Sequence, residues 1–225
     1  MSKNVLIIGA SRGIGLELCR QYIAQGNKVI ATCRRSTNEL SMLDCQVIEN
    51  TEVTSDDSVN DMLKFLHGVL KGQRLDIVIH NSGILRSDSY PDIDFDNMRE
   101  HFDVNTLGPL RTTQALESLL KQGSKVGIVS SRVGSIDDNT SSNNYAYRVS
   151  KTAVNMIGKC LSIDLAPKGI ALALLHPGYV KTDMTNHNGL ITPKESAAGL
   201  IKRMDELDMS TTGSFVHTSG ERLVW

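Results

Sequence analysis

Aromatic residues are scarce in this sequence, and neither sign of charge predominates. Phe, Trp and Tyr together make up 4% of the 225 residues, and the formal net charge is -1. A surface that binds nucleic acid usually needs clustered basic groups and aromatic rings on which bases can stack. The composition therefore argues against nucleic-acid binding. It also gives no electrostatic reason to bind an anionic membrane.

Paired cysteines, metal-ligand motifs and long apolar runs are also missing. No C-x-x-C pair and no H-E-x-x-H occurs, so we expect reduced thiols and no protein-bound metal. The cysteines are widely spaced, at Cys19, Cys33, Cys45 and Cys160. No segment approaches the roughly 18 apolar residues of a membrane span. We therefore expect a soluble, cytoplasmic protein.

Short β-rich runs alternate with longer helical patterns along the chain. Strands are predicted over 5–8, 28–33, 45–49, 75–80, 125–130, 170–175 and 214–217. Helices are predicted over 13–25, from the Ser55 cap onward, over 104–121, from about 145, and from 193 behind a Thr192 cap. Apolar strands separated by helices predict an α/β fold with a mostly parallel sheet covered on both faces. Right-handed crossovers make this a doubly wound, Rossmann-type domain. No repeat or linker divides the chain, so we expect residues 1–225 to form a single domain.

The helix predicted from about 145 carries apolar residues at three- and four-residue spacing. This periodicity predicts one buried stripe along the helix. Its members are Val149, Ala153, Met156, Ile157, Cys160 and Leu161.

A glycine-rich loop joins the first strand to the first helix. It reads Gly9-Ala10-Ser11-Arg12-Gly13-Ile14-Gly15. Glycines allow a tight turn and a close approach of backbone N–H groups to a pyrophosphate, and the helix N-terminus adds partial positive charge. The loop therefore predicts a dinucleotide site. The alternative is a glycine-rich turn with no ligand.

The end of the second predicted strand bears on the choice of cofactor. Dinucleotide folds that prefer NAD usually place an acid about 20 residues after the glycine loop. Here no Asp or Glu occurs between Glu17 and Glu39, and Arg34 stands at the strand end instead. Arg34, helped by Arg12, could pair with a 2′-phosphate. We expect NADPH, with NAD less favoured, although Arg34 and Arg35 could be plain solvated charges.

A tyrosine and a lysine share one face of the helix predicted from about 145. Tyr147 and Lys151 lie four residues apart. That spacing alone is weakly informative, and its value comes from other motifs at predicted strand ends. Ser131 follows one strand, Asn81 follows another, and His176 begins a third such motif. Strand ends of a doubly wound sheet meet at one ligand crevice.

Together these positions resemble the classical short-chain dehydrogenase/reductase family, nearly from end to end. The resemblance rests on motifs in the correct order: the glycine loop, His80-Asn81-Ser82-Gly83 in place of N-N-A-G, Asn105, Ser131, Tyr-x-x-x-Lys at Tyr147 and Lys151, and Pro177-Gly178 followed by Thr182. Residues 130–136, 145–151 and 220–225 are most similar to the subgroup of C-factor and sniffer-type carbonyl reductases.

The resemblance implies roles for these residues. Tyr147 would be the general acid in reduction and the base in oxidation. Lys151 would lower the pKa of that tyrosine, from about 10 in a free side chain, and bond the nicotinamide ribose. Ser131 would hold the substrate oxygen, and Asn105 would position a water in a proton relay. The cofactor contacts that the resemblance implies are Gly9, Ser11, Arg12, Gly13, Ile14, Gly15, Arg34, Glu52, Val53, Asn81, Ser82, Gly83, Tyr147, Lys151, Pro177, Gly178, Val180 and Thr182.

The sequence departs from the family pattern at a few positions near the cofactor site. Ile8 replaces the usual threonine before the first glycine, and His80 replaces the first asparagine of N-N-A-G. Ser82 replaces an alanine, and Glu52 stands where an acid near the adenine is often found. None of these changes removes a catalytic group, but Ile8 and His80 bear on the geometry of the cofactor site.

The first functional hypothesis is an NADPH-dependent carbonyl reductase acting on a small-molecule carbonyl or alcohol. One alternative is a dinucleotide-binding signalling protein of C-factor type with incidental turnover. The complete set of Asn105, Ser131, Tyr147 and Lys151 argues against it. An epimerase or dehydratase is disfavoured because no second substrate domain is evident. The resemblance leaves a homodimer or homotetramer open.

Residues 183–192 form a short polar connection, which we expect to be mobile and to leave the pocket open to varied substrates.

Overall fold

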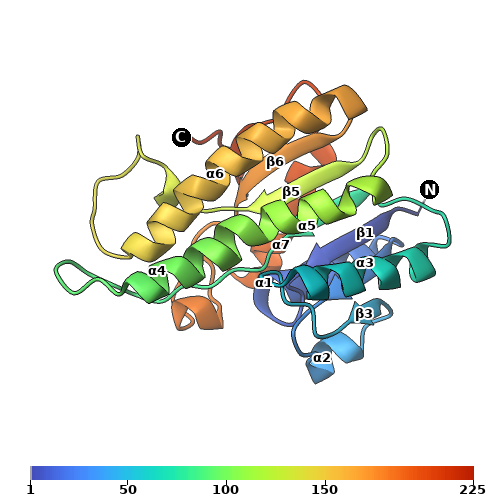
Figure 1. Cartoon of the computed structure of the whole chain (residues 1–225), viewed down its shortest axis with the longest axis horizontal. Helices are drawn as coiled ribbons and strands as arrows, with labels where there is room; N and C mark the ends of the chain where they lie inside the picture. The colour runs from blue at the N-terminus through green and yellow to red at the C-terminus, as the bar shows by residue number, and fades with distance from the viewer. Residues whose placement is uncertain (1) are drawn as a thin grey trace.

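The short apolar runs of the sequence become the strands of one parallel sheet. The computed structural model describes residues 2–225, and within them seven strands lie in the order β3-β2-β1-β4-β5-β6-β7 (Figure 1). The strands are β1 (Asn4–Ile8), β2 (Lys28–Thr32), β3 (Gln46–Ile48), β4 (Ile77–His80), β5 (Lys125–Val129), β6 (Ala171–His176) and β7 (Ser214–His217). Every neighbouring pair is parallel. The predicted α/β fold is confirmed, and the sheet in this part of the chain is parallel throughout rather than mostly so.

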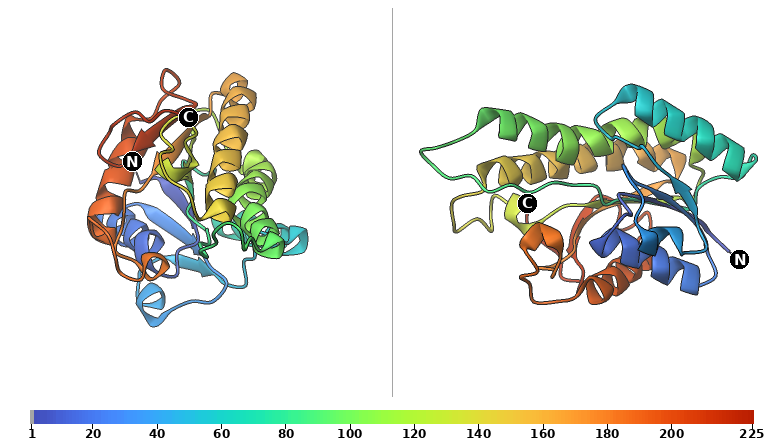
Figure 2. Two further views of the ribbon diagram at one scale, coloured as in Figure 1. Left: turned by 90° about the vertical axis from the view of Figure 1, so that its left-hand side faces the viewer. Right: turned by 90° about the horizontal axis from the view of Figure 1, so that it is seen from below.

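Helices cover both faces of the sheet, as Figure 2 shows. One face carries α1 (Gly13–Ala24), α2 (Asn38–Ser41) and α7 (Pro193–Glu206). The other carries α3 (Asp56–Leu70), α4 (Phe95–Phe102), α5 (Gly108–Leu116) and α6 (Tyr145–Leu165). Among the described residues, no helix combines the length and the apolar character needed to cross a membrane.

The strands are apolar along their whole length because each of them faces two cores. Side chains alternate between the faces of a strand. In β1, Leu6 and Ile8 enter the core beneath α3, α5 and α6. Val5 and Ile7 enter the core beneath α1 and α7. A strand buried on both faces has no position that favours a polar residue, which explains the continuous apolar runs.

The prediction of one regular helix over 104–121 is wrong, because the helical segment begins earlier and contains a π-helical turn. Helix α4 begins at Phe95, where the Asp94 side chain accepts hydrogen bonds from the backbone N–H groups of Asp96 and Asn97. A π-helical turn over Asp103–Leu107 then joins α4 to α5. The prediction missed the Asp94 cap because few apolar residues follow it. A π-turn has no signature in hydrophobic periodicity.

The predicted buried stripe on α6 is also wrong. Val149 and Met156 are 47% and 66% exposed, and Cys160 is exposed as well. The buried face carries Val154 and Leu165 as well as small residues such as Gly158. A Cβ added to Gly158 would lie 2.6 Å from Leu174 Cδ2. At Gly158, therefore, α6 lies too close to β6 for any side chain larger than hydrogen.

Candidate active site

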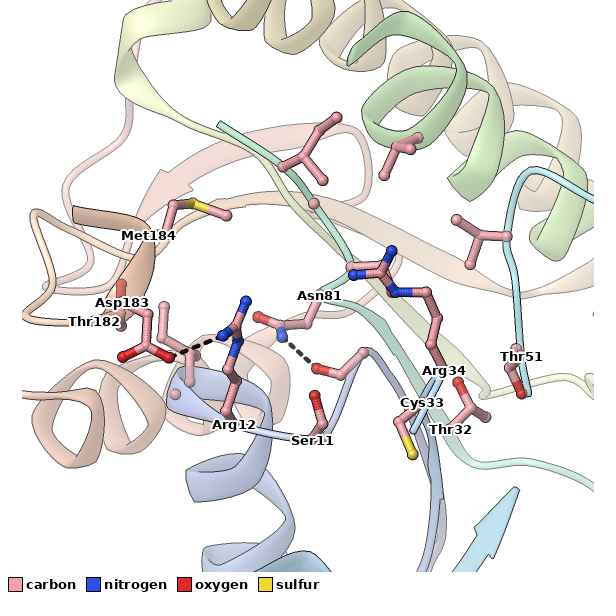
Figure 3. A pocket seen from close by; sticks show the side chains of 18 of the residues that line it. Ser11, Arg12, Thr32, Cys33, Arg34, Thr51, Asn81, Thr182, Asp183 and Met184 are labelled. Atoms are coloured by element: carbon pink, nitrogen blue, oxygen red, sulfur yellow. Dashed lines mark hydrogen bonds and ion pairs between the residues drawn. The ribbon is translucent and has the colours of Figure 1, made fainter. Parts of the chain in front are cut away.

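A cavity of about 630 Å³ opens at the carboxyl edge of the sheet (Figure 3). All strands are parallel, so the loops that follow β1, β2 and β4 meet at this edge. Twelve of the predicted cofactor contacts line the cavity: Gly9, Ser11, Arg12, Gly13, Ile14, Arg34, Glu52, Val53, Asn81, Ser82, Gly83 and Thr182. Its volume lies within the range of about 300–1,000 Å³ that is typical of small-molecule sites.

The glycine loop adopts a conformation that demands its glycines. Gly9 has φ +88° and Gly13 has φ +57°, both in the left-handed region. A Cβ on Gly15 would lie 2.1 Å from the carbonyl oxygen of Gly9. Asn81 Nδ2 donates to that same oxygen at 2.7 Å, which ties the β4 loop to the glycine loop. The loop is therefore held tightly against the start of α1.

The start of α1 leaves backbone donors free for a ligand. Arg12 occupies the N-cap position with extended backbone, and its side chain makes no capping bond to the helix. The first N–H groups of a helix have no partner within that helix. Uncapped N–H groups and the helix dipole together favour an anion at this end of the cavity.

Two arginines lie at the cavity, Arg12 within the glycine loop and Arg34 after β2. Arg12 Nη1 lies 3.0 Å from Asp183 Oδ2, so it bridges the loop to the segment after β6. Arg34 projects from the end of β2 on the other side of Asn81 (Figure 3). The structure thus separates the two cations that the sequence grouped at the 2′-phosphate, and Arg12 already has an acidic partner.

The segment that covers this end of the cavity is more ordered than a plain polar loop. Thr182 and Thr185 form a capping box around a short 3₁₀ turn. Val180 pairs with Ile191 across the segment, and the N–H of Leu190 donates to Tyr179 O at 2.7 Å. The short connection predicted over 183–192 is thus built around its own hydrogen bonds.

Tyr147, Lys151 and Ser131 lie together beyond the cavity. Tyr147 and Lys151 project from the first two turns of α6, and Ser131 follows β5. Lys151 Nζ lies 5.6 Å from the centroid of the Tyr147 ring and donates to the carbonyl oxygen of Val129 at 2.9 Å. Gly83 of the β4 loop approaches the same ammonium, since an added Cβ would lie 3.7 Å from Nζ.

Burial moves the pKa values of this pair in opposite directions. It raises the pKa of Tyr147 to about 12, while the neighbouring Ser131 hydroxyl acts to lower it. It lowers the pKa of Lys151 to about 8. Removal from water disfavours the charged form of each group, phenolate in one case and ammonium in the other. At neutral pH Tyr147 is therefore a neutral phenol, and Lys151 still carries its proton.

Asn105 lies in the π-turn between α4 and α5, with both N–H donors of its side-chain amide engaged. Its Nδ2 donates to Ile84 O and to Ser150 Oγ, each at 3.0 Å. Its Oδ1 accepts from the N–H of Ile84 at 2.8 Å. π-turns within helices occur frequently at functional sites. The side chain joins the β4 loop to α6 and has no free N–H for a relay water.

His80, which stands in place of the first asparagine of N-N-A-G, is buried between β4 and α5. Its ring is buried, with Nδ1 3.0 Å from Thr112 Oγ1 and Nε2 3.0 Å from Thr113 Oγ1. The Thr112 hydroxyl donates to Gly108 O, so it accepts from Nδ1–H, and Nε2 accepts from Thr113. Burial lowers the pKa of His80 to about 3, so the ring is neutral. His80 thus joins β4 to α5 and does not line the cavity.

The cavity also includes residues that the sequence did not indicate. They come from the ends of β2 and β3, from the β4 loop, from the π-turn and from the segment after β6: Thr32, Cys33, Thr51, Ile84, Val104 and Met184 among them. Small and apolar side chains of this kind form no recognisable sequence motif, so the sequence could not indicate that they line the cavity. Conversely, Gly15, Asn105, Ser131, Tyr147, Lys151, Pro177, Gly178 and Val180 lie outside its immediate lining.

Comparison with known proteins identifies the family of this chain. The model of the short chain dehydrogenase family matches residues 3–190. A 1-hydroxy-2-glutathionyl-2-methyl-3-butene dehydrogenase of Rhodococcus sp. (strain AD45) is 43% identical over 226 residues, covering 99% of each chain. The C-signal protein of Myxococcus xanthus is 38% identical over 154 residues, which are 67% of this chain and 93% of that protein.

Solved structures give the same result. The NADPH-bound carbonyl reductase from chicken fatty liver superposes with a TM-score of 0.92 at 30% identity, covering 100% of this chain and 99% of the other. The carbonyl reductase Sniffer of D. melanogaster gives a TM-score of 0.93 at 28% identity, with both chains covered completely. The family model, the full-length relative and the shared architecture lead to one conclusion: this chain belongs to the short-chain dehydrogenase family and is an oxidoreductase.

Proposed function

We propose that this protein transfers hydride between NADPH and a small-molecule carbonyl or alcohol, with Tyr147 as the general acid in reduction and the base in oxidation. The observation that carries the proposal is the convergence of Tyr147, Lys151 and Ser131 beside a dinucleotide-sized cavity. A protein that only bound a dinucleotide would need the cavity, but it would not need the buried Tyr147 phenol beside the buried Lys151 ammonium.

The described residues fit a dinucleotide. The uncapped N-terminus of α1 and the left-handed Gly9 and Gly13 would receive the pyrophosphate. Arg34 is exposed at the end of β2, where it could pair with a 2′-phosphate. Lys151 would bond the nicotinamide ribose, and Thr182 would contact the carboxamide end. The NADPH-bound relative from chicken supports the choice of NADPH.

When bound, the reduced nicotinamide supplies the hydride, and the protein supplies the proton. The Ser131 hydroxyl would hold the substrate oxygen. Tyr147, whose pKa is raised to about 12, is protonated at neutral pH and can donate to that oxygen as the hydride reaches the carbon. The resulting phenolate would lie beside the Lys151 ammonium, which stabilises it electrostatically.

Asn105 would act through the β4 loop and α6 rather than on the substrate. Its three hydrogen bonds hold Ile84 and Ser150 in place on either side of the site. Ser150 directly precedes Lys151, so this contact orients the turn of α6 that carries the lysine. We therefore assign Asn105 a positioning role. A relay water could bind only an oxygen of this residue, because both amide N–H groups are already engaged.

The relatives suggest two substrate types for a first screen. The solved relatives include proteins described as carbonyl reductases, and the Rhodococcus relative is described as a dehydrogenase of a hydroxylated glutathionyl compound. A panel of aldehydes, ketones and quinones with NADPH should therefore be joined by alcohols that carry a glutathionyl thioether, with NADP⁺. Consumption or formation of NADPH reports both directions.

The signalling alternative finds some support in the C-signal relative, although that match covers 67% of this chain. A protein that binds a dinucleotide for signalling alone has no need of the serine, tyrosine and lysine together. Substrate-dependent turnover across the panel would separate the two hypotheses.

The decisive test is Tyr147→Phe. The change keeps the ring and its packing and removes only the proton donor. General acid catalysis contributes roughly 10²–10⁴ in rate, so kcat should fall by at least about a hundredfold. NADPH affinity, measured by fluorescence titration, should stay close to that of the wild type.

Tyr145→Phe is the matched control, because Tyr145 lies on the same turn but is exposed. We expect it to keep most of the activity. If Tyr147→Phe instead turned over substrate like the wild type, Tyr147 would be an ordinary helix residue and the proposed function would be wrong.

A further inference from the structure

Helix α6 carries Tyr147 but lacks a cap of its own. Asn144 occupies the N-cap position in the left-handed conformation, with φ 53°, and its side chain makes no capping bond. The first N–H groups of a helix need partners from elsewhere when no local side chain supplies them. Tyr147 is the third residue of this helix, so a frayed first turn would move the phenol directly.

The missing cap comes from Asp88, 57 residues earlier than Tyr145. Asp88 Oδ1 accepts from the N–H of Tyr145 at 2.5 Å, and Oδ2 accepts from the N–H of Ala146 at 2.9 Å. The backbone oxygen of Asp88 accepts from the N–H of Asn144 at 2.9 Å. One residue thus satisfies three successive N–H groups at the start of α6. Its carboxylate also opposes the positive end of the helix dipole.

The segment that carries Asp88 is itself held at two earlier points. Ile84 exchanges hydrogen bonds with the Asn105 amide. The N–H of Arg86 donates to His101 Nε2 at 3.1 Å, and His101 Nδ1 donates to Asn97 O at 2.8 Å. The segment is therefore fixed to α4 and the π-turn before it reaches α6.

The same framework reaches the Tyr147 ring from its side. The buried His101 ring packs edge-on against that of Tyr147, with centroids 6.4 Å apart and an interplanar angle of 81°. Both nitrogens of His101 already have partners, so its ring is held in one orientation. The tyrosine is thus positioned by His101 at its ring and by Asp88 at its backbone.

We infer that Asp88 is a positioning residue for hydride transfer: its carboxylate caps α6 and so holds the Tyr147 phenol in the geometry that proton transfer requires. This inference rests on the proposed function, since it assumes that Tyr147 donates the proton. Asp88 itself touches no reacting atom. Because a misplacement of about 1 Å can cost on the order of a hundredfold in rate, loss of this cap acts on turnover.

Three variants test the inference. Asp88→Ala removes both capping oxygens, and Asp88→Asn keeps one acceptor oxygen. Asp92→Ala is the matched control, because Asp92 is an exposed carboxylate in the same segment with the same charge. We expect Asp88→Ala to lower kcat by about ten- to a hundredfold, with the Kd for NADPH within about twofold of wild type. Asp88→Asn should recover part of that loss, and Asp92→Ala should behave as wild type.

Amide hydrogen exchange supplies a readout that does not depend on activity. In Asp88→Ala the N–H groups of Tyr145 and Ala146 should exchange faster, because they lose their carboxylate partners, while those in the middle of α6 stay protected. Faster exchange with unchanged kcat would overturn the inference, since the cap would then have no effect on the chemistry. Unchanged exchange at Tyr145 and Ala146 would overturn it as well. Should Asp88→Ala fail to fold, the graded loss in Asp88→Asn carries the same test.

Tyr147→Phe separates this inference from the proposed function. If Tyr147→Phe keeps its turnover, the proposed function fails whatever Asp88 does. If Tyr147→Phe is inactive while Asp88→Ala keeps the wild-type kcat, only the positioning role of Asp88 fails.

Discussion

At the residue scale, His80 is the departure from the family pattern with the clearest thermodynamic consequence. The neutral ring is clamped between two threonines, and burial lowers its pKa to about 3 from an ordinary value of 6.5. The unfolded chain takes up a proton below about pH 6.5, and the folded chain does not until about pH 3. Stability should therefore fall as the pH drops through this window.

Exchanging His80 for the family's asparagine should flatten that dependence. At pH 5 the unfolded state gains up to about 2 kcal/mol from protonating this one histidine, at 1.36 kcal/mol per pKa unit. Urea unfolding at pH 7.5 and at pH 5 should show a smaller loss of stability for His80→Asn than for wild type. Part of the acid sensitivity should remain, because burial also lowers the pKa of His176 to about 3. A pH dependence of stability in His80→Asn equal to that of the wild type would contradict the prediction.

Arg34 is the residue that should decide between the two nicotinamide cofactors. Its side chain is exposed at the cavity, whereas Arg12 is already paired with Asp183. A charge-assisted hydrogen bond contributes roughly 1.5–3 kcal/mol, which corresponds to about ten- to a hundredfold in affinity. Arg34→Ala should weaken NADPH binding by that factor and leave NADH binding nearly unchanged. Equal losses for both cofactors, measured by calorimetric titration, would mean that Arg34 is structural.

At the element scale, two glycines in helices should respond in opposite ways to the same substitution. Gly15 lies in α1, where an added Cβ would meet Gly9 O at 2.1 Å. Gly15→Ala must therefore push the glycine loop out of shape, and we expect NADPH binding to be lost together with several kcal/mol of stability, on the order of a severe steric mutation. Gly68 lies in α3 with nothing within 4 Å of its added Cβ.

Gly68→Ala is therefore the control for Gly15→Ala. It should stabilise the protein by roughly 0.5–1 kcal/mol, since alanine favours a helix over glycine by that amount. Thermal unfolding of both variants, with and without NADPH, checks the pair. A Gly15→Ala variant that binds NADPH normally would show that the close approach to Gly9 is not required.

At the scale of the whole molecule, the outer face of α6 exposes a row of large apolar side chains. Val149, Met156 and Ile163 recur every seven residues on its outer face and are 47%, 66% and 63% exposed. Phe95 and Phe102 of α4, a helix that packs against α6, are exposed as well. An apolar stripe of this kind on a helix often marks a contact between copies of a chain. We expect two copies to pack through this face.

Met156→Glu should weaken that association, because it places a charge in the middle of the stripe. Light scattering coupled to size-exclusion chromatography should show a shift from dimer toward monomer, with the activity of the monomer retained. Phe65→Glu is the control, since Phe65 is also an exposed aromatic but lies on α3. A wild-type protein that is monomeric at high concentration would rule the interface out.

Much of this protein can be read from its sequence because the relevant interactions are local. The Thr192 cap, Pro193 and Glu195 predicted the start of α7, and the structure has this capping box. Ser55 likewise caps α3. The apolar runs predicted the strands to within one or two residues, because a strand buried on both faces needs apolar side chains throughout. The ordered motifs predicted the family on the same local grounds.

Tertiary structure decided the rest, because it depends on which distant segments meet. The apolar periodicity of α6 could not show which face lies on β6, because Gly158, which lies against Leu174 of that strand, contributes no apolar side chain to the pattern. The capping of α6 by Asp88 joins residues 57 positions apart. The hydrophobic pattern of the sequence cannot predict such a contact. The contact forms only when the folded sheet brings the β4 loop and the start of α6 to the same edge.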